Sequence, residues 1–321
     1  MSSIRYCLFL FGLIILFGFP GAALPLPVPD FTVVPVTGPA PLTVQFTDTS
    51  LNRTGAWAWF FGDETYKEPW TLVNASAGWS PRIAHTSVAM PDGSIVLMGG
   101  IENGSIVKND TWLSDNGGVT WIRMNGSAGW SARYGHNSVV MPDGSIVLMG
   151  GYDGVRKNDT WRSTDKGATW SLINASSGWT AREMHNSVVT SDSSIVLMGG
   201  YIYGGYTNDT WRSTNNGTTW TRVNASSGWT ARQSHSSVAM KDGSIILMGG
   251  IGGGSFKNDT WRSRDNGATW TQQTASPGWS ARYGHSSVVM PDSSIVLMGG
   301  GGTGRKSDVW RSTDYKIHGC R

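Results

Sequence analysis

Five Arg-x-x-His phrases carry the residues whose types and spacing most invite a chemical role. Their members are Arg82, His85, Arg133, His136, Arg182, His185, Arg232, His235, Arg282 and His285. Histidine is a common metal ligand, so five histidines near one axis would suggest a metal site. Metal sites, however, use asymmetric sets of three or four ligands with supporting partners, which an identical repeated phrase does not provide. We therefore predict that the phrase is a structural anchor that bonds neighbouring backbone, and we expect no metal or other cofactor.

Catalytic carboxylates are scarce. Hydrolysis of a glycoside generally needs a pair of carboxylates, and sialidase chemistry needs an arginine cluster with a Tyr/Glu pair. After residue 23 the glutamates are Glu64, Glu68, Glu102 and Glu183, and nothing in the sequence pairs Glu183 with Asp153. We expect no catalytic residue and no enzyme activity. A carbohydrate-active hydrolase stays as an alternative.

The elements that position these residues are set by an internal repeat. The five histidines lie 51, 49, 50 and 50 residues apart, and each is followed by an apolar run ending in Gly-Gly and then by Asp and Trp. A period near 50 with paired glycines predicts a β-propeller of four-stranded blades. The 43 glycines, the 17 tryptophans and a charged fraction of only 15% suit short strands and tight turns. A net charge of +3 without a basic run gives no indication of nucleic-acid binding.

The second copy shows the expected blade, with strands a to d at 136–141, 145–149, 158–163 and 169–174. Strand b is apolar at nearly every position, as is typical of a strand buried on both faces. Pro142-Asp-Gly144 and the segment Ser163 to Trp170 have the residues of tight turns.

The combination Arg-x-x-His, Gly-Gly and Trp at this period resembles the Kelch repeat. The turn between strands c and d, Ser163-Thr-Asp165-Lys-Gly167-Ala-Thr169-Trp170, resembles the Asp-box of sialidases and other propellers. The likeness covers most of the chain after residue 66. It implies the fold, and it says little of function because such propellers host many unrelated activities.

Five blades follow from counting strands. Strands a, b and c occur five times, but the last copy lacks its strand d, whereas Pro69 to Ser76 matches strand d of the third copy, Thr219 to Ser226. We expect the strand led by Trp70 to complete the last blade beside Trp310, so that no edge stays open. An open arc, or six blades using Trp57 to Phe61, are the alternatives.

Variable loops on one face are the candidate binding site. Connections d–a and b–c emerge on one face. The a–b and c–d turns hardly vary among the copies, whereas the b–c loops do, which is typical either of binding loops on a scaffold or of relaxed constraint. The candidate residues are Trp79, Trp130, Trp179, Trp229, Trp279, Tyr152, Asp153, Arg156, Tyr201, Tyr203, Tyr206 and Phe256. The tryptophans would suit sugar rings as flat platforms, or would fill the seams between blades.

The N-terminal residues predict that the protein is exported. Residues 1–23 have the charge, the apolar core and the small-residue cleavage site of a signal peptide, with a retained anchor as the alternative. No later segment could cross a membrane. Residues 24–66 resemble the first half of a PKD domain, an immunoglobulin-like sandwich, through Pro41, Val44, Phe46, Asp48 and the Trp59 to Asp63 phrase. The propeller is expected at 67–315, and Cys320 in the tail 316–321 is a free thiol or pairs with another chain.

These features predict a secreted or cell-surface binding or adhesion module that recognises a glycan or a partner protein. A structural component of a cell envelope is a further alternative. The sequence also has many Asn-x-Ser/Thr sites, of which Asn103 and Asn125 are expected in loops open to glycosylation.

Overall fold

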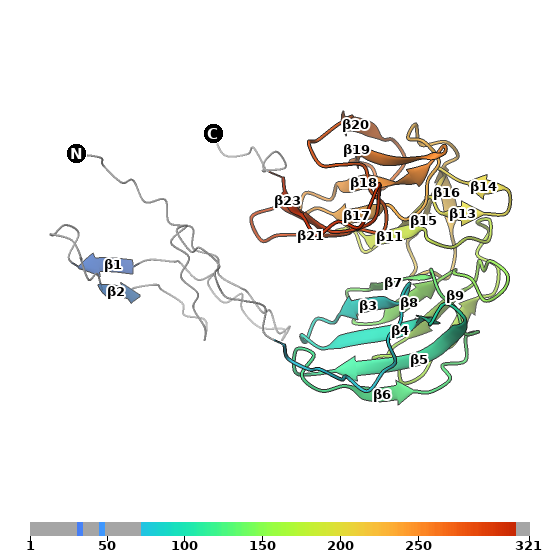
Figure 1. Ribbon diagram of the computed structural model, residues 1–321, viewed down its shortest axis with the longest axis horizontal. Coiled ribbons are helices and arrows are strands. Elements are labelled where there is room, and N and C mark those ends of the chain that lie inside the picture. Colours follow the sequence, from blue (N-terminus) through green and yellow to red (C-terminus); the bar gives the residue numbers. More distant parts are fainter. Residues whose placement is uncertain (1–30, 35–44, 49–71, 313–321) are drawn as a thin grey trace, which may run out of the picture. The chain divides into compact units, whose positions relative to one another are not determined.

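The computed structural model describes residues 31–34, 45–48 and 72–312, which belong to two units, Met1–Thr71 and Leu72–Arg321 (Figure 1). In the first unit, β1 (Phe31–Val34) pairs antiparallel with β2 (Gln45–Asp48). The remainder of the PKD-like segment, the leader at 1–23, Trp70 and Cys320 lie outside the described residues. No helix long and apolar enough to cross a bilayer occurs among the residues that the structure describes.

In its described residues the second unit contains five antiparallel blade sheets and a separate two-stranded hairpin, which confirms the all-β propeller and its five blades. Blade one is β3 (Thr86–Ala89), β4 (Ile95–Glu102), β5 (Ile106–Ser114) and β6 (Ile122–Asn125). Blade two is β7 (Asn137–Val140), β8 (Ile146–Met149), β9 (Thr160–Ser163) and β10 (Ser171–Asn174). Blade three is β11 (Asn186–Val189), β12 (Ile195–Met198), β15 (Thr210–Ser213) and β16 (Thr221–Asn224), with a hairpin of β13 (Tyr201–Ile202) and β14 (Gly205–Tyr206) in its b–c loop. Blade four is β17 (Ser236–Ala239), β18 (Ile245–Gly252), β19 (Ser255–Ser263) and β20 (Thr271–Thr274). Blade five is β21 (Ser286–Val289), β22 (Ile295–Met298) and β23 (Val309–Arg311).

The first strands of the blades lie at the centre. Contacts join β3 to β7, β7 to β11, β11 to β17 and β17 to β21, and residues of all five strands line a central channel of about 440 Å³. Backbone hydrogen bonds connect successive blades, each from an N–H to the carbonyl of the preceding blade: Gly135 to Ala84, Met184 to Gly135, Ser234 to Met184, and Gly284 to Ser234. This chain of bonds fixes the histidine phrases of the five blades relative to one another.

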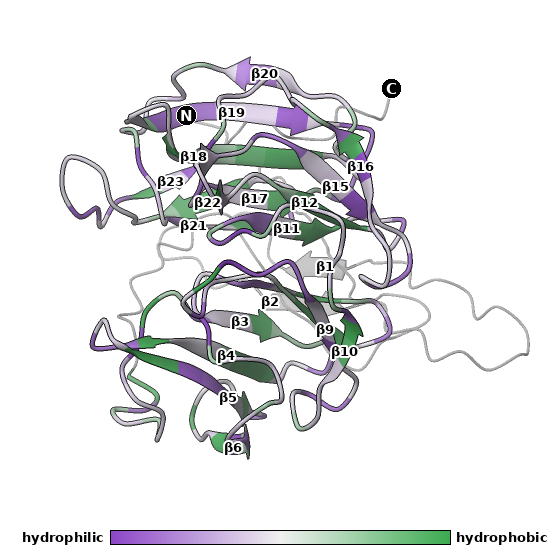
Figure 2. Ribbon diagram, turned by 90° about the vertical axis from the view of Figure 1, so that its right-hand side faces the viewer, coloured by the Kyte–Doolittle hydropathy of each residue, from purple (hydrophilic) through white to green (hydrophobic). Residues whose placement is uncertain are grey.

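The second strands form the core. Ile146, Val147, Leu148 and Met149 of β8 are fully buried because blades pack against both faces of the strand. Figure 2 shows the corresponding strand β18 as largely hydrophobic beside the more hydrophilic β19. Four clusters of apolar side chains fill the interfaces from blade one to blade five in series. Burial between blades therefore supplies the main stabilisation of the propeller.

Blade five differs from the expected closed blade. It has three strands in the described part of the chain, and the outer strand β23 is exposed, with Val309 at 66% and Trp310 at 38%. Leu72 and Val73, the first described residues of the predicted closing strand, are not in a strand and are 77% and 53% exposed. The five-blade count is thus confirmed, whereas the pairing of the first strand with the last is not seen among the described residues.

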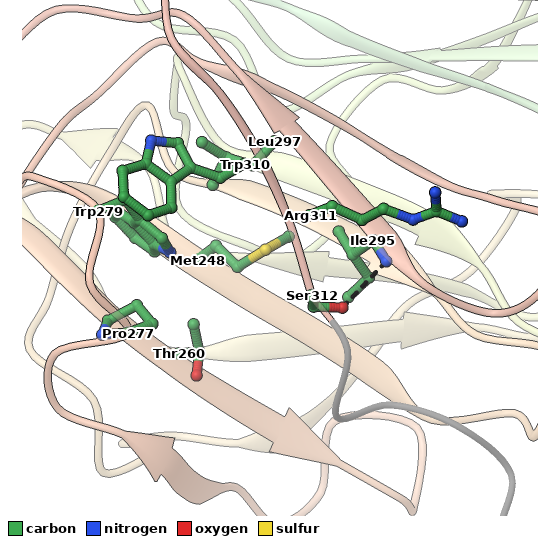
Figure 3. Close-up of a pocket in the computed structure, with 9 residues that line it drawn as sticks. All are labelled: Met248, Thr260, Pro277, Trp279, Ile295, Leu297, Trp310, Arg311 and Ser312. Atoms are coloured by element: carbon green, nitrogen blue, oxygen red, sulfur yellow. Dashed lines mark hydrogen bonds between the residues drawn. The ribbon is translucent and has the colours of Figure 1, made fainter. Parts of the chain in front are cut away.

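A pocket of about 80 Å³ lies between blades four and five (Figure 3). It is lined by Met248, Thr260, Pro277, Trp279, Ile295, Leu297, Trp310, Arg311 and Ser312. The lining is mainly apolar. The equivalent positions in the other three blade interfaces belong to packed clusters of apolar side chains.

Gly151, the second glycine of its pair, should not tolerate a side chain. Its φ is +101°, and a Cβ there would lie 2.8 Å from Cβ of His136. Gly144 also has a positive φ, of +78°, but a Cβ there would meet nothing within 4 Å. We expect Gly144→Ala to cost about 1 kcal/mol for its conformation alone. Gly151→Ala should cost roughly 1–3 kcal/mol more because of overpacking. Urea unfolding of both variants measures the difference, and equal losses would contradict the close packing at Gly151.

Candidate functional site

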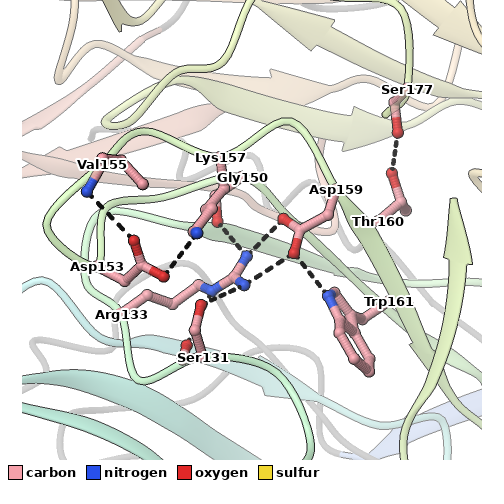
Figure 4. Close-up of polar contacts among 10 residues, drawn as sticks. All are labelled: Ser131, Arg133, Gly150, Asp153, Val155, Lys157, Asp159, Thr160, Trp161 and Ser177. Carbon is pink, nitrogen blue, oxygen red and sulfur yellow. Dashed lines mark hydrogen bonds and ion pairs between the residues drawn. The ribbon is translucent and has the colours of Figure 1, made fainter. Parts of the chain in front are cut away.

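The arginine of each Arg-x-x-His phrase lies in a closed hydrogen-bond network, shown for Arg133 in Figure 4. Its Nη1 and Nη2 donate to the two carboxylate oxygens of Asp159 at 2.6 and 2.8 Å, and Nη1 also donates to the Gly150 carbonyl at 2.9 Å. The indole N–H of Trp161 donates to the same carboxylate at 2.8 Å. All five copies make the same ion pair, to Asp110, Asp159, Asp209, Asp259 and Asp308.

This network leaves little room for another role of the arginines. Arg182 is fully buried, and its guanidinium is bonded to Asp209, to the Gly199 carbonyl and to the Thr180 carbonyl. Burial acts to raise the pKa of Asp209, but the hydrogen bonds and the charge of Arg182 outweigh it and hold the pKa below its usual value. Each arginine therefore joins the start of strand c to the end of strand b and to the d–a loop that carries the arginine.

Four of the five histidines, His136, His185, His235 and His285, are buried, and His85 is partly buried. Burial lowers the pKa of His136 to about 3, and the charge of Arg133 acts in the same direction. The ring lies 5.9 Å from the ring of Trp130, and its Nε2 is 3.1 Å from the Thr86 hydroxyl of the preceding blade. Within the described residues, no three His, Cys, Asp or Glu side chains are grouped so that they could hold a metal ion.

The tryptophans of the d–a loops are not exposed platforms, and that expectation is corrected. Trp130, Trp179 and Trp229 are at most 1% exposed, Trp279 is 6% exposed, and Trp79 is partly buried. Each of the four buried rings belongs to a core cluster between two blades. The four buried indoles therefore fill the seams between blades, which is the second of the two roles that the sequence left open.

Aromatic and charged side chains gather instead where the b–c loops of blades two and three meet. The guanidinium carbon of Arg156 lies 4.2 Å from the ring centre of Tyr201 and 5.7 Å from that of Tyr152. Nη2 of Arg156 pairs with Oε1 of Glu183 at 3.0 Å, while its Nε is buried without a partner among the described residues. Burial raises the pKa of Glu183, although the charge of Arg156 opposes this.

Further tyrosines extend this group. The ring of Tyr134 lies 5.5 Å from that of Tyr152, and the ring of Tyr206 lies 5.4 Å from that of Tyr201. Tyr203, in the turn between β13 and β14, is 93% exposed. We name the whole set the tyrosine–arginine face: Tyr134, Tyr152, Arg156, Glu183, Tyr201, Tyr203 and Tyr206.

Phe256 belongs to a different place on the same rim. It stacks on Tyr283 with ring centres 5.2 Å apart and an angle of 19°. Phe256 lies on β19 of blade four, and Tyr283 lies within the last Arg-x-x-His phrase, which precedes blade five. The structure thus divides the predicted site residues between two aromatic groups.

The carboxylates of these loops are all engaged by cations. Asp153 pairs with Lys157 at 2.8 Å, Glu183 with Arg156 at 3.0 Å, and Glu102 with Lys108 at 2.7 Å. Burial tends to raise the pKa of Asp153, yet its hydrogen bond from Lys157 helps to keep it below the usual value. Such pairs fix the loops and do not resemble a free acid and base.

Tyr134 and Tyr283 were missed in the sequence. They follow the arginine of their phrase, and the residue at this position bridges to the first residue of the b–c loop in all five copies, as in Tyr134 with Tyr152 and Glu183 with Tyr201. This position varies among the copies as the loops do (Ile83, Tyr134, Glu183, Gln233, Tyr283). That variation inside a constant phrase is the signal that could have revealed them.

In several of the Asn-x-Ser/Thr sites the asparagine amide already makes a hydrogen bond to the next blade. Asn125 ends β6, and its Nδ2 donates to the Ala168 carbonyl of the next blade at 2.8 Å, so its placement in an open loop is corrected. Asn174 and Asn224 make the equivalent bonds to Thr218 and Ala268. Asn103, in contrast, lies in an exposed turn.

Comparison with known proteins agrees with this architecture. Residues 169–313 match the family model of the KLHDC2/KLHL20/DRC7 Kelch-repeats domain. Over these residues the propeller is similar to Kelch repeats. A solved structure described as "Structure of YjhT" superposes with a TM-score of 0.59 at 17% identity, covering 72% of this chain and 81% of that chain. At this identity the likeness shows the fold alone, and no curated protein matches the sequence.

The Kelch match spans less than half of the chain, from the turn that precedes β10 to the end of the described residues. It includes Glu183 and the β13–β14 hairpin, but not Tyr134, Tyr152 or Arg156. The tyrosine–arginine face is therefore built partly on matched repeats and partly on an equivalent blade before them.

Proposed function

We propose that this Kelch propeller is a non-catalytic binding module that recognises a partner protein through the tyrosine–arginine face. The observation that carries the proposal is the stack of Arg156 on Tyr201, 4.2 Å from the ring centre, beside the exposed Tyr203. Tyrosine and arginine are enriched among the residues that dominate the energy of protein interfaces.

The geometry supports this role because the side chains are held in place before binding. Arg156 is fixed by Glu183 and by two tyrosine rings, and the ion pair between Lys157 and Asp153 braces the same loop internally. A surface that is already ordered loses less conformational entropy when a partner binds. A rigid scaffold with variable loops is a common arrangement for recognition.

A glycan is the alternative ligand. Tyrosine rings can stack on sugars, but the burial of Trp130, Trp179 and Trp229 removes the larger platforms on which that expectation was based. A hydrolase gains no support because Asp153 and Glu183 are each paired with a cation. We place the module outside the cell or at its surface on the basis of the leader-like residues 1–23 alone.

A peptide library and a glycan array, both probed with the purified chain, test the proposal. We expect enriched peptides whose binding is weakened about 10- to 30-fold by Tyr201→Ala and by Arg156→Ala. Leu172→Ala is the matched control, since Leu172 is 48% exposed on the outer strand β10. Binding of glycans alone would favour the alternative, and peptide binding that neither variant weakens would contradict the assigned face.

A further inference from the structure

A lysine ends the b–c loop in four of the five blades, and in two of them an acid of the same loop neutralises it. The lysines are Lys108, Lys157, Lys257 and Lys306. In blade one, Glu102 pairs with Lys108 at 2.7 Å, and in blade two Asp153 pairs with Lys157 at 2.8 Å. Both carboxylates belong to the residue that follows the first residue of the loop. The chain therefore holds an acid of its own beside each of these two lysines.

The d–a loop supplies a second partner for this carboxylate. In blade two, the Ser131 hydroxyl accepts a hydrogen bond from Nη2 of Arg133 at 2.8 Å and donates its own to Asp153. Figure 4 shows the carboxylate of Asp153 directed toward Lys157. Blade one repeats the arrangement around Glu102. We name the lysine and the serine, with the arginine that fixes the serine, the carboxylate cradle.

Blade five has the same cradle. Ser280 Oγ accepts a hydrogen bond from Nη2 of Arg282 at 3.2 Å, and Lys306 ends the loop. The loop is as long as that of blade two and has the equivalent backbone bridge, here between Gly301 and Arg305. The cationic and hydroxyl groups of the cradle are therefore carried by equivalent positions in the two blades.

The acid is missing from the copy in blade five. Gly302 stands where blade two has Asp153. A Cβ on Gly302 would lie 3.6 Å from Cε of Lys306 but only 2.6 Å from the Ala281 carbonyl oxygen. The position thus borders the cradle and is too close to the backbone for an acidic side chain. Among the residues that the structure describes, the ammonium of Lys306 has neither an ion pair nor a hydrogen bond.

The described acids of blade five are engaged elsewhere. Asp308 accepts from both Nη atoms of Arg282, and Asp292 pairs with Arg311 at 2.6 Å. Arg305, the residue before the lysine, is exposed and also has no ion pair in the described part of the chain. The cradle therefore carries positive charge that these residues do not neutralise.

The remaining two blades do not offer the same site. In blade four, Nζ of Lys257 donates to the Ser255 hydroxyl of its own loop at 2.9 Å. Thr230 replaces the serine of the cradle there, and Arg232 donates to its carbonyl. Blade three has Thr207 in place of the lysine. Within the described residues, blade five alone has the lysine and the serine arranged for a carboxylate and no carboxylate in place.

An aromatic ring borders the open cradle. Tyr283 is 38% exposed, and a Cβ on Gly301 would lie 3.0 Å from its ring, so the ring lies over the residue next to Gly302. Tyrosine is enriched among the residues that dominate the energy of protein interfaces. An acid bound at Lys306 would therefore have a surface beside it for an apolar or aromatic neighbour.

We infer that the cradle of blade five, formed by Ser280 and Lys306, binds an aspartate or glutamate side chain of a partner protein, in an acidic segment that also packs on Tyr283. The chemistry is that of Glu102 and Asp153, which hold the corresponding place in blades one and two. A charge-assisted hydrogen bond is stronger than one between neutral groups, and complementary charge favours the correct partner. The inference is separate from the tyrosine–arginine face, because the two share no residue.

Fluorescence anisotropy of the full chain with a labelled glutamate-rich peptide that contains a phenylalanine tests the inference. The same peptide with glutamine in place of glutamate should bind at least about 10-fold more weakly, and Lys306→Gln should weaken the glutamate peptide about 5- to 10-fold. Lys241→Gln is the matched control, since it removes the same charge from the a–b turn between β17 and β18.

Equal weakening by both variants would show an effect of net charge alone and would overturn the inference, as would equal binding of the two peptides. Binding of heparin through Lys306, without binding of the glutamate peptide, would overturn it in favour of an anionic polysaccharide.

A gain of binding tests the equivalence of the cradles. In the Lys306→Gln background, Asp153→Gly removes the internal acid of blade two, and we expect it to recover most of the lost affinity for the glutamate peptide. Asp143→Gly is the control, because it frees a different cation, Arg162, outside any cradle. No recovery, or equal recovery in the control, would contradict the assignment of the cradle as a carboxylate site.

Discussion

Arg182→Ala is expected to lower the free energy of unfolding by about 3–5 kcal/mol. The side chain is fully buried, and its loss leaves the buried carboxylate of Asp209 without its cationic partner and the Gly199 carbonyl without the Arg182 donor. Removal of one partner of a buried ion pair is costly because the other charge stays buried. Urea unfolding of the full chain, followed by near-ultraviolet circular dichroism, measures the loss.

Arg212→Ala is the matched control for this prediction. Arg212 lies in the same blade and pairs with Asp192 at 2.5 Å, but the two side chains are 31% and 42% exposed. Exposed pairs contribute about 0–1 kcal/mol, so this variant should stay close to the parent. Similar losses in both variants would contradict the structural role given to the buried arginine.

Stability should fall as the pH is lowered from 6.5 towards 4. Burial holds the pKa of His136 and His235 at about 3 and that of His285 at about 4, and it lowers the pKa of His185 as well. The unfolded chain binds protons at these histidines near pH 6.5, whereas the folded chain does not until the pH is far lower. The unfolded state therefore binds more protons in this range, and each buried histidine contributes a slope of about 1.4 kcal/mol per pH unit.

Urea unfolding at pH 7, 6 and 5 measures this slope. The aspartates of the ion pairs have lowered pKa values, as for Asp209 and Asp259, so their contribution is lost only below their usual pKa and does not explain a loss above pH 5. His235→Gln should be less stable at pH 7 but should show a slope smaller by about 1.4 kcal/mol per pH unit. A free energy of unfolding that is constant from pH 7 to 5 would show that the histidines are not buried as described.

The repeat made most of the fold predictable from the sequence. The apolar run before each Gly-Gly gave strand b, and the observed β8 at Ile146–Met149 lies within the expected 145–149. Turn chemistry gave the boundaries, because Asp165 and Ser163 accept or donate the bonds that shape the c–d turn. The count of five blades followed from five copies of strands a, b and c.

The direction of the d–a tryptophans was not predictable from their spacing. Gly178 has a φ of +81°, and a Cβ there would lie 3.7 Å from the ring of Trp211. This backbone lets the chain pass over one indole while the next, Trp179, lies inside the core cluster. The sequence of a Gly-Trp pair is the same whether the indole is buried between blades or exposed on the surface.

The tyrosine–arginine face was predicted only in part, for a related reason. Tyr152, Arg156 and Tyr201 were identified from loop variation, but their mutual contacts depend on how two blades approach each other. The sequence places Glu183 and Arg156 far apart along the chain, and only the fold brings their charges to 3.0 Å.

Hydrogen–deuterium exchange of the full chain, with and without the tightest peptide from the library, tests the central claim most directly. The account predicts slower exchange at 152–156 and 201–206, on the b–c loops of blades two and three. Slower exchange confined to the a–b and c–d turns, with those two loops unchanged, would contradict it.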